Sequence, residues 1–178
     1  MESEIRAQFE AFGKTGLPLD HVNAHNHLQL HPTVLNLILK AGCEHGMKAI
    51  RLPFEPPLLS WRASRRSLAS RLATGLFLRP WIAHMRSRLT RARLHSNDYV
   101  FGLLDSGAMT AERTIQILSR LPEGVTEIYF HPATRRCPEI ERALPGYWHE
   151  QEFAALINPA VKHALEKLGV RRIAFSDL

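Results

Sequence analysis

The chain has 178 residues, 45% of them hydrophobic, which is enough to form the core of one domain. Its two cysteines, Cys43 and Cys137, lie far apart without a CxxC partner, which argues against a disulfide framework or a thiolate zinc site. No run approaches the roughly 18 apolar residues of a membrane span, and the charged N-terminus is unlike a signal peptide. We therefore expect a single domain over residues 1–178, located in the cytoplasm.

The formal net charge of +6 is unevenly distributed. Nine arginines fall between Arg62 and Arg93, and no acidic residue occurs between Glu55 and Asp98. The remaining sequence mixes both signs, as soluble surfaces usually do. The net charge alone therefore does not indicate a nucleic-acid-binding protein.

Helix and strand signals alternate in the first half of the chain. Turn residues, prolines and apolar periodicity set the boundaries. The expected elements are a helix over 4–12, a strand over 19–28, a helix over 33–45, a strand over 48–52 and two Arg-rich helices over 60–78 and 80–94, separated at Pro80.

The second half continues this alternation. The expected elements are a strand over 99–104, a helix over 110–121 capped by Thr110, a strand over 126–130, helices over 149–156 and 159–168, and a final strand over 171–175. Alternating strands and helices predict an α/β fold with a parallel sheet, either open or closed into a barrel.

The most informative segment is 21–32, which reads HVNAHNHLQLHP. Because side chains alternate along a strand, a strand here would place His21, Asn23, His25, His27 and Gln29 on one face. Unpaired polar groups are costly to bury, so such a face is unusual in a structural strand. Imidazoles bind metal ions and titrate near neutral pH, which favours ligands or proton donors.

A single histidine is more often an ordinary surface or hydrogen-bonded residue. We apply that interpretation to the isolated histidines His45, His84, His95, His149 and His163. His25 and His27 differ because they occur together, just before a helix that starts with proline. For this pair we favour metal binding or catalysis.

Two motifs resemble those of a known family. Residues 23–29 (NAHNHLQ) look like the D-x-H-x-H-x-H stretch of the YdjC-like carbohydrate deacetylases, and residues 126–132 (TEIYFHP) resemble their E-x-x-x-HP motif. Residues 19–39 and 51–56 are similar to the branch associated with hopanoid biosynthesis, HpnK. The resemblance covers nearly the whole chain.

The resemblance implies a partial, irregular (β/α) barrel of the deacetylase type. In this family a divalent metal ion, zinc or magnesium, activates water to remove an N-acetyl group from an amino sugar. His25 would be a metal ligand with His27 as the second candidate, and His131 would protonate the leaving amine. The expected substrate-side residues are Asn23, Arg51, Glu55 and Glu127.

The chain departs from the family pattern at its start. An Ala-Asp-Asp-Phe-Gly type motif and a Gly-Leu-His-Leu motif, which carry the base and further ligands, are not in the sequence. Asn23 and Gln29 replace the acid and the last histidine of the histidine motif. We therefore expect that the N-terminal strands of the barrel are missing and that this chain alone is inactive.

Residues 60–95 read as a basic helical insertion, for which three interpretations stay open. The arginines can form a solvated face over a core-packed stripe. They can bind an anionic membrane at its inner face, with Trp61 or Trp81 at the interface, which suits a glycolipid substrate such as acetylglucosaminyl hopanoid. They can also track nucleic-acid phosphates, although no nucleic-acid motif accompanies them. A fragment that only packs or binds sugar is a further alternative, and the oligomeric state is unknown.

Overall fold

A computed structural model describes residues 1–178 and divides them into two compact units. Unit 1 comprises residues 1–53, 82–97 and 172–178, and unit 2 comprises 54–81 and 98–171. Each unit is thus assembled from segments that are far apart in the sequence.

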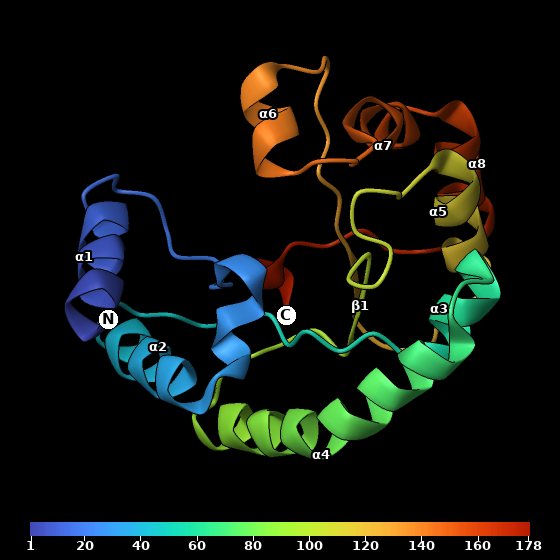
Figure 1. Cartoon of the computed structure of the whole chain (residues 1–178). Coiled ribbons are helices and arrows are strands. Elements are labelled where there is room, and N and C mark those ends of the chain that lie inside the picture. Colours follow the sequence, from blue (N-terminus) through green and yellow to red (C-terminus); the bar gives the residue numbers. More distant parts are fainter. The chain divides into compact units, whose positions relative to one another are not determined.

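Helices dominate the structure (Figure 1). None of them has the length and apolar character needed to cross a bilayer. In chain order the elements are α1 (Glu2–Gly13), the 3₁₀ turn η1 (His25–Leu30), α2 (Pro32–Glu44), α3 (Pro57–Ser64), α4 (Leu68–Arg91), β1 (Tyr99–Phe101), α5 (Ala111–Leu118), β2 (Thr126–Ile128), α6 (Pro138–Ala143), α7 (His149–Leu156), α8 (Pro159–Lys167) and η2 (Phe175–Asp177).

Helices α2, α5, α7 and α8 start within a residue of the predicted positions, whereas α3 starts at Pro57, three residues early, and α6 was not predicted. Helices α2, α3, α6 and α8 each have a proline in the first turn, where its missing N–H costs no helical hydrogen bond. The hydroxyl of Thr110 accepts a hydrogen bond from the amide of Arg113, which confirms the expected cap of α5. The helix over 149–156 is also confirmed.

Unit 1 packs α1 and η1 against α2, beside three extended segments. Val22 pairs with Ile50, and Ala49 pairs with His95, both in parallel. The buried side chain of Asn97 acts as a further rung, because its Oδ1 accepts from the Leu52 amide at 2.8 Å and its Nδ2 donates to the Leu52 carbonyl at 2.9 Å. The core includes Leu35, Ile38, Ala49, Ile50, Leu52, Met85 and Leu89.

Unit 2 contains the regular sheet, which has two parallel strands. Tyr99 lies opposite Thr126 and Phe101 lies opposite Ile128. Helix α5 packs against α3, α7 and α8, and the core is formed by Phe101, Met109 and Ile117. The structure is thus mixed α/β with parallel strands, and a closed barrel remains a prediction.

Several sequence expectations are wrong. The strands expected over 19–28 and 48–52 are reduced to isolated bridges at Val22, Ala49 and Ile50. From His25 the chain forms η1, in which Asn26 and His27 adopt the left-handed conformation with φ of 49° and 55°. The final strand over 171–175 does not form, and the chain ends in η2. Pro80 lies inside α4 and does not separate two helices, because residues on both sides of it are buried. The break falls instead at 65–67, between α3 and α4, where Arg65 and Ser67 have positive φ.

Replacing Asn97 with alanine tests whether its side chain stabilises the extended segment at Leu52. Both backbone groups of buried Leu52 would lose their partner, so we expect the free energy of unfolding to fall by about 2–4 kcal/mol in urea denaturation. The matched control is Asn36→Ala, which removes an exposed hydrogen bond from Arg88 and should change it by less than about 0.5 kcal/mol. Equal effects of the two substitutions would contradict this role.

Candidate functional site

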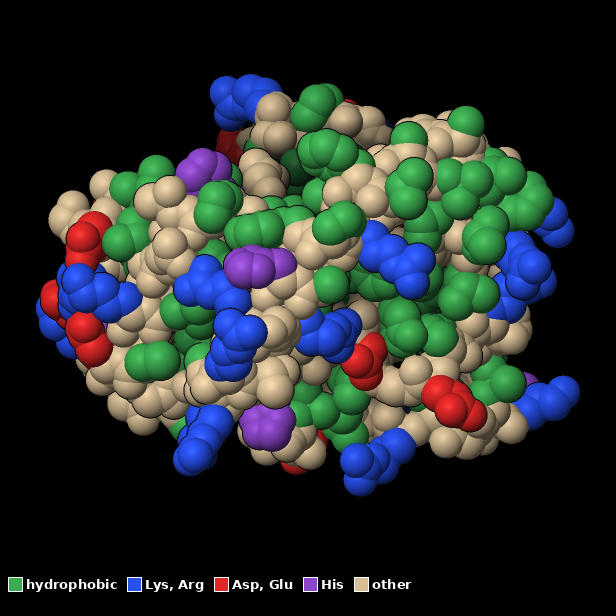
Figure 2. Space-filling model, turned by 90° about the horizontal axis from the view of Figure 1, so that it is seen from below, with side chains coloured by type: hydrophobic (Ala, Val, Ile, Leu, Met, Phe, Trp, Pro, Cys, Tyr) green, Lys and Arg blue, Asp and Glu red, His purple; other side chains and the backbone are tan.

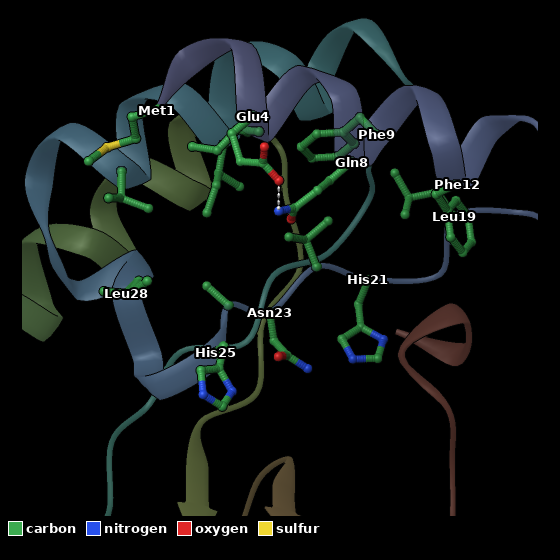
Figure 3. Close-up of a pocket in the computed structure, with 15 residues that line it drawn as sticks. Met1, Glu4, Gln8, Phe9, Phe12, Leu19, His21, Asn23, His25 and Leu28 are labelled. Atoms are coloured by element: carbon green, nitrogen blue, oxygen red, sulfur yellow. Dashed lines mark hydrogen bonds between the residues drawn. The ribbon is translucent and has the colours of Figure 1, made fainter. Parts of the chain in front are cut away.

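A pocket of about 480 Å³ lies in unit 1 next to the histidine segment (Figure 3). Side chains of α1, of residues 19–25 and of α2 line it, and most are apolar, including Phe9, Leu19 and Ile38. Its polar side chains are Glu4, Gln8, His21, Asn23 and His25. An apolar pocket with a few polar groups at one side is the usual form of a small-molecule site.

Alternation holds over the first part of the histidine segment. In Figure 3 the side chains of His21, Asn23 and His25 follow one another and point away from α1. The ring of His21 stacks on Phe175 with centroids 4.2 Å apart, and its Nδ1 lies 3.0 Å from Oδ2 of Asp20. This hydrogen bond lowers the pKa of the Asp20 carboxyl. His21 is therefore held in place, whereas His25 is exposed.

His27 does not continue this row. The left-handed turn at Asn26 and His27 ends the two-residue alternation, so the expected shared strand face of His25 and His27 is wrong. No group of three or more His, Cys, Asp or Glu side chains in the chain is placed to hold a metal ion. Because catalytic zinc sites generally use three protein ligands, these residues do not form a complete metal site.

Gln29 shows why the row ends. Its side chain is fully buried, with Oε1 accepting from the Ala24 amide at 3.3 Å and Nε2 donating to the Arg51 carbonyl at 3.4 Å. It therefore ties the turn to the neighbouring extended segment. Asn23 is exposed, and Arg51 is half-buried with its amide bonded to the Val22 carbonyl.

A second cluster lies in unit 2, beyond the carboxyl end of β2. The Glu152 carboxylate accepts hydrogen bonds from the backbone amides of His131 and, at 2.9 Å, of Met109. Nδ1 of His149 lies 2.5 Å from the His131 carbonyl oxygen and donates to it. Both side chains come from α7 and are almost fully buried. Helix α7 thus holds the backbone of His131 at its N–H and at its C=O.

Aromatic rings flank the His131 imidazole. The rings of Tyr129 and Tyr147 lie edge-on to it, with centroids at 5.2 and 5.1 Å. The Tyr147 hydroxyl also donates to Oγ of Ser106 at 3.0 Å, which fixes that ring. His131 itself is half-buried. The side chain is therefore restrained laterally while it remains accessible to solvent.

Sequence reasoning identified His131 but missed Tyr147, His149 and Glu152. His149 was placed among the ordinary histidines because it occurs alone in the sequence. The sequence carries no spacing signal that links 147–152 to 131, since the contacts form only when α7 folds back on the segment after β2. Glu127 lies within β2, opposite Val100, and is half-buried.

Glu55 lies in a buried polar network of unit 2. Its Oε1 accepts from the Ser60 hydroxyl, and its Oε2 accepts from the amides of Leu103 and Leu104 at 2.8 and 3.0 Å. Burial raises the pKa of this carboxyl.

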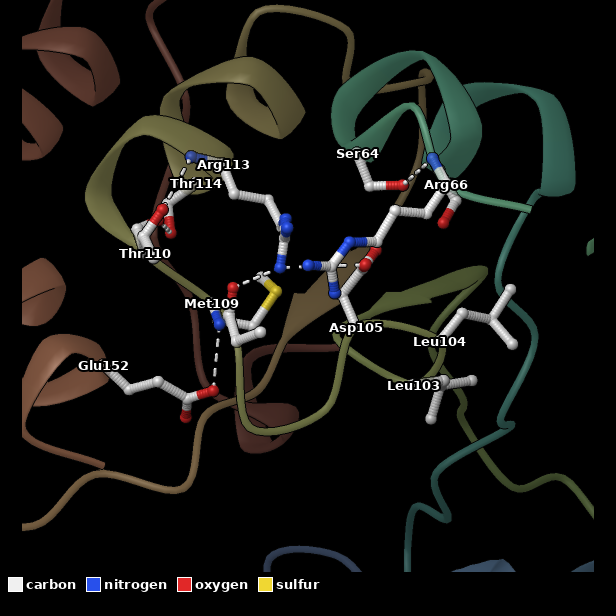
Figure 4. A network of polar contacts seen from close by, with 12 residues as sticks. Ser64, Arg66, Leu103, Leu104, Asp105, Met109, Thr110, Arg113, Thr114 and Glu152 are labelled. Atoms are coloured by element: carbon white, nitrogen blue, oxygen red, sulfur yellow. Dashed lines mark hydrogen bonds and ion pairs between the residues drawn. The ribbon is translucent and has the colours of Figure 1, made fainter. Parts of the chain in front are cut away.

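Arg71 contacts both oxygens of Asp105 at 2.9 Å in the same network. Figure 4 shows Asp105, on the loop after β1, beside Arg113 of α5. The contacts of Glu55 with the Leu103 and Leu104 amides suit a residue that holds this loop in place, and the substrate-binding role of Glu55 remains a prediction.

Comparison with known proteins places the chain in a family. A sequence model described as YdjC-like protein matches residues 1–167. The chain belongs to this family. No solved structure matches it.

Curated relatives of this YdjC-like chain carry the name carbohydrate deacetylase. The protein from Geobacillus stearothermophilus is 24% identical over 99% of this chain and 59% of the relative, and that from Vibrio parahaemolyticus is 23% identical over 98% and 57%. A third, from Brevibacillus brevis, is 35% identical over 42% of this chain and 28% of its own length. The chain therefore spans less than two thirds of the length of the relatives that it matches.

Replacing Glu152 with alanine tests the attachment of His131 to α7. Two buried amides, those of Met109 and His131, would lose their acceptor, so we expect the free energy of unfolding to fall by about 2–5 kcal/mol. Amide hydrogen exchange at both positions should accelerate. The control is Glu150→Ala, an exposed position on the same helix, which should cost less than about 1 kcal/mol. A Glu152 variant as stable as the Glu150 variant would rule out this attachment.

Proposed function

We propose that this chain carries the proton-donor half of a carbohydrate deacetylase site, which hydrolyses the N-acetyl group of an amino sugar. The observation that supports it most is the placement of His131 in a chain of this family. Its backbone is held at both polar groups, and its ring lies between two tyrosines at the end of a parallel strand. Catalytic groups of α/β folds are typically found at that end of the strands.

The chemistry requires a group of this kind. Water adds to the amide carbonyl, the C–N bond then breaks, and the products are acetate and the free amine of the sugar. Expulsion of an unprotonated amine anion is prohibitively slow near neutral pH, so a proton must reach the nitrogen as the bond breaks. His131, in its protonated form, supplies this proton and then recovers one from water.

Metal dependence is a separate part of the proposal. His25 and His27 are the ligands that this chain offers to a zinc or magnesium ion, of which His25 is the better candidate because it is exposed in line with Asn23. No third His, Cys, Asp or Glu side chain lies with them to complete a metal site. A fragment without catalytic activity is the competing possibility.

The substrate-side proposals rest on sequence resemblance. We propose an acetylated amino sugar carried on a lipid such as acetylglucosaminyl hopanoid, because residues 19–39 and 51–56 are similar to the hopanoid-associated branch. Asn23, Arg51, Glu55 and Glu127 remain the proposed substrate-binding residues. Asn23 is exposed, Arg51 and Glu127 are half-buried, and Glu55 is buried.

Acetate release tests the role of His131. We expect none from this chain alone with N,N′-diacetylchitobiose, and turnover after fusion to the part of the Geobacillus relative that this chain does not match. In that fusion His131→Ala should lower kcat by about a hundred- to ten-thousand-fold. His163→Ala, at an exposed position in α8, is the matched control and should leave kcat unchanged. Full activity of the His131 variant would refute the proton-donor role.

Metal content separates the two histidine roles in the same fusion. His25→Ala should lower the bound zinc or magnesium, since it removes a proposed ligand, whereas His131→Ala should keep the metal. Elemental analysis of both purified variants beside kcat makes the distinction. If His131→Ala loses the metal while His25→Ala keeps it, the roles are reversed.

A further inference from the structure

The first half of α4 exposes an apolar face. The exposed fractions are 42% for Leu72, 76% for Leu76 and 84% for Phe77. At 100° per residue these three side chains lie on one side of the helix. Ala69, Ala73 and Pro80 are exposed on the same side. We call this surface, formed by 69, 72, 73, 76, 77 and 80, the outer face of α4.

The opposite side of this half-helix is already occupied within unit 2. Arg71 points inward, where its guanidinium bonds to Asp105 and to the Ser60 hydroxyl. Gly75 lies so close to Pro57, at the start of α3, that a β-carbon at this position would clash with the proline ring. The helix therefore cannot rotate to bury Leu76 and Phe77 in its own unit. Apolar patches of this kind usually mark an interaction surface.

Positive charge accompanies this apolar surface. Arg62, Arg65 and Arg66, at the end of α3 and just after it, are exposed, as is Arg79 on α4. No acidic residue occurs between Glu55 and Asp98 to offset them. Figure 2 shows the molecule from the side on which α4 lies in Figure 1, with hydrophobic and basic side chains intermixed and a few acidic ones beside them.

We propose that the outer face of α4 and these arginines form a binding surface for an anionic lipid bilayer. Exposed leucine and phenylalanine side chains enter the boundary between headgroups and acyl chains, and arginines pair with lipid phosphates. The charge argues against a second copy of the chain as the occupant, because a symmetric contact would bring two identical cationic surfaces together. This proposal does not depend on the proposed sugar chemistry.

Nucleic acid explains the arginines but not the apolar side chains. Binding of single-stranded nucleic acids is strengthened by aromatic side chains on which the bases stack, and Phe77 is the only aromatic residue of the outer face. Leu72 and Leu76 gain nothing from a phosphate backbone. A bilayer instead removes all three side chains from water while it satisfies the charge.

Vesicle binding of the full chain tests the proposal. We expect the chain to cosediment with vesicles of about 30% phosphatidylglycerol in phosphatidylcholine, which have an anionic surface. Binding to vesicles of phosphatidylcholine alone should be much weaker. Leu76→Ser with Phe77→Ser should weaken partitioning at least about tenfold. Each of Arg62→Gln and Arg79→Gln should weaken it about fivefold, and less at high salt.

The matched control is Leu156→Ser with Ile157→Ser, which removes two exposed apolar side chains of unit 2 at the end of α7. This variant should bind vesicles as the parent chain does, and circular dichroism should show that all variants are folded. Equal binding to neutral and anionic vesicles, or an equal loss in the control, would overturn the proposal. So would sedimentation that shows a dimer broken only by the Leu76 and Phe77 substitutions, or a preference for DNA or RNA over vesicles.

Discussion

The buried carboxylate of Glu152 is the interaction on which the organisation of the His131 cluster depends. It accepts hydrogen bonds from two backbone amides, Met109 before α5 and His131 after β2. A buried carboxylate is costly unless such donors satisfy it, and buried amides are equally costly without an acceptor. Each group therefore requires the others, and helix α7 is fixed to both segments. His149, one turn away on the same helix, adds a bond to the carbonyl of His131.

Local signals in the sequence predicted several helices well, but not α6 or the boundary between α3 and α4. Proline in the first turn, the Thr110 cap and apolar periodicity act over a few residues, so the boundaries of α5, α7 and α8 came close to the expected ones. Pro80 misled for a related reason. Its local preference to break a helix is real, but the burial of Arg71 and Met85 on either side of it outweighs that preference. Burial of this kind depends on distant residues and cannot be read from a short window.

The candidate site was predictable only where a single strand carried the signal. Alternation placed His21, Asn23 and His25 on one side, as observed. It failed at His27 because the buried Gln29 side chain accepts a hydrogen bond from the Ala24 amide and donates one to the Arg51 carbonyl, which requires the chain to turn at Asn26. Tyr147, His149 and Glu152, which contact His131, follow it in the sequence by 16, 18 and 21 residues. These separations give no periodic pattern. Only the folded chain brings them together.

The two groups of histidines differ in how far the protein fixes them. A proton donor works efficiently when its position is set before the substrate arrives, because ordering it during the reaction costs entropy. His131 meets this condition, since both backbone polar groups are bonded and Tyr129 and Tyr147 confine its ring. His25 is exposed next to a left-handed turn, with no three-ligand cluster around it. A bound metal ion would have to supply that order itself, so the proposed ligand roles of His25 and His27 require more reorganisation than the proposed acid-base role of His131.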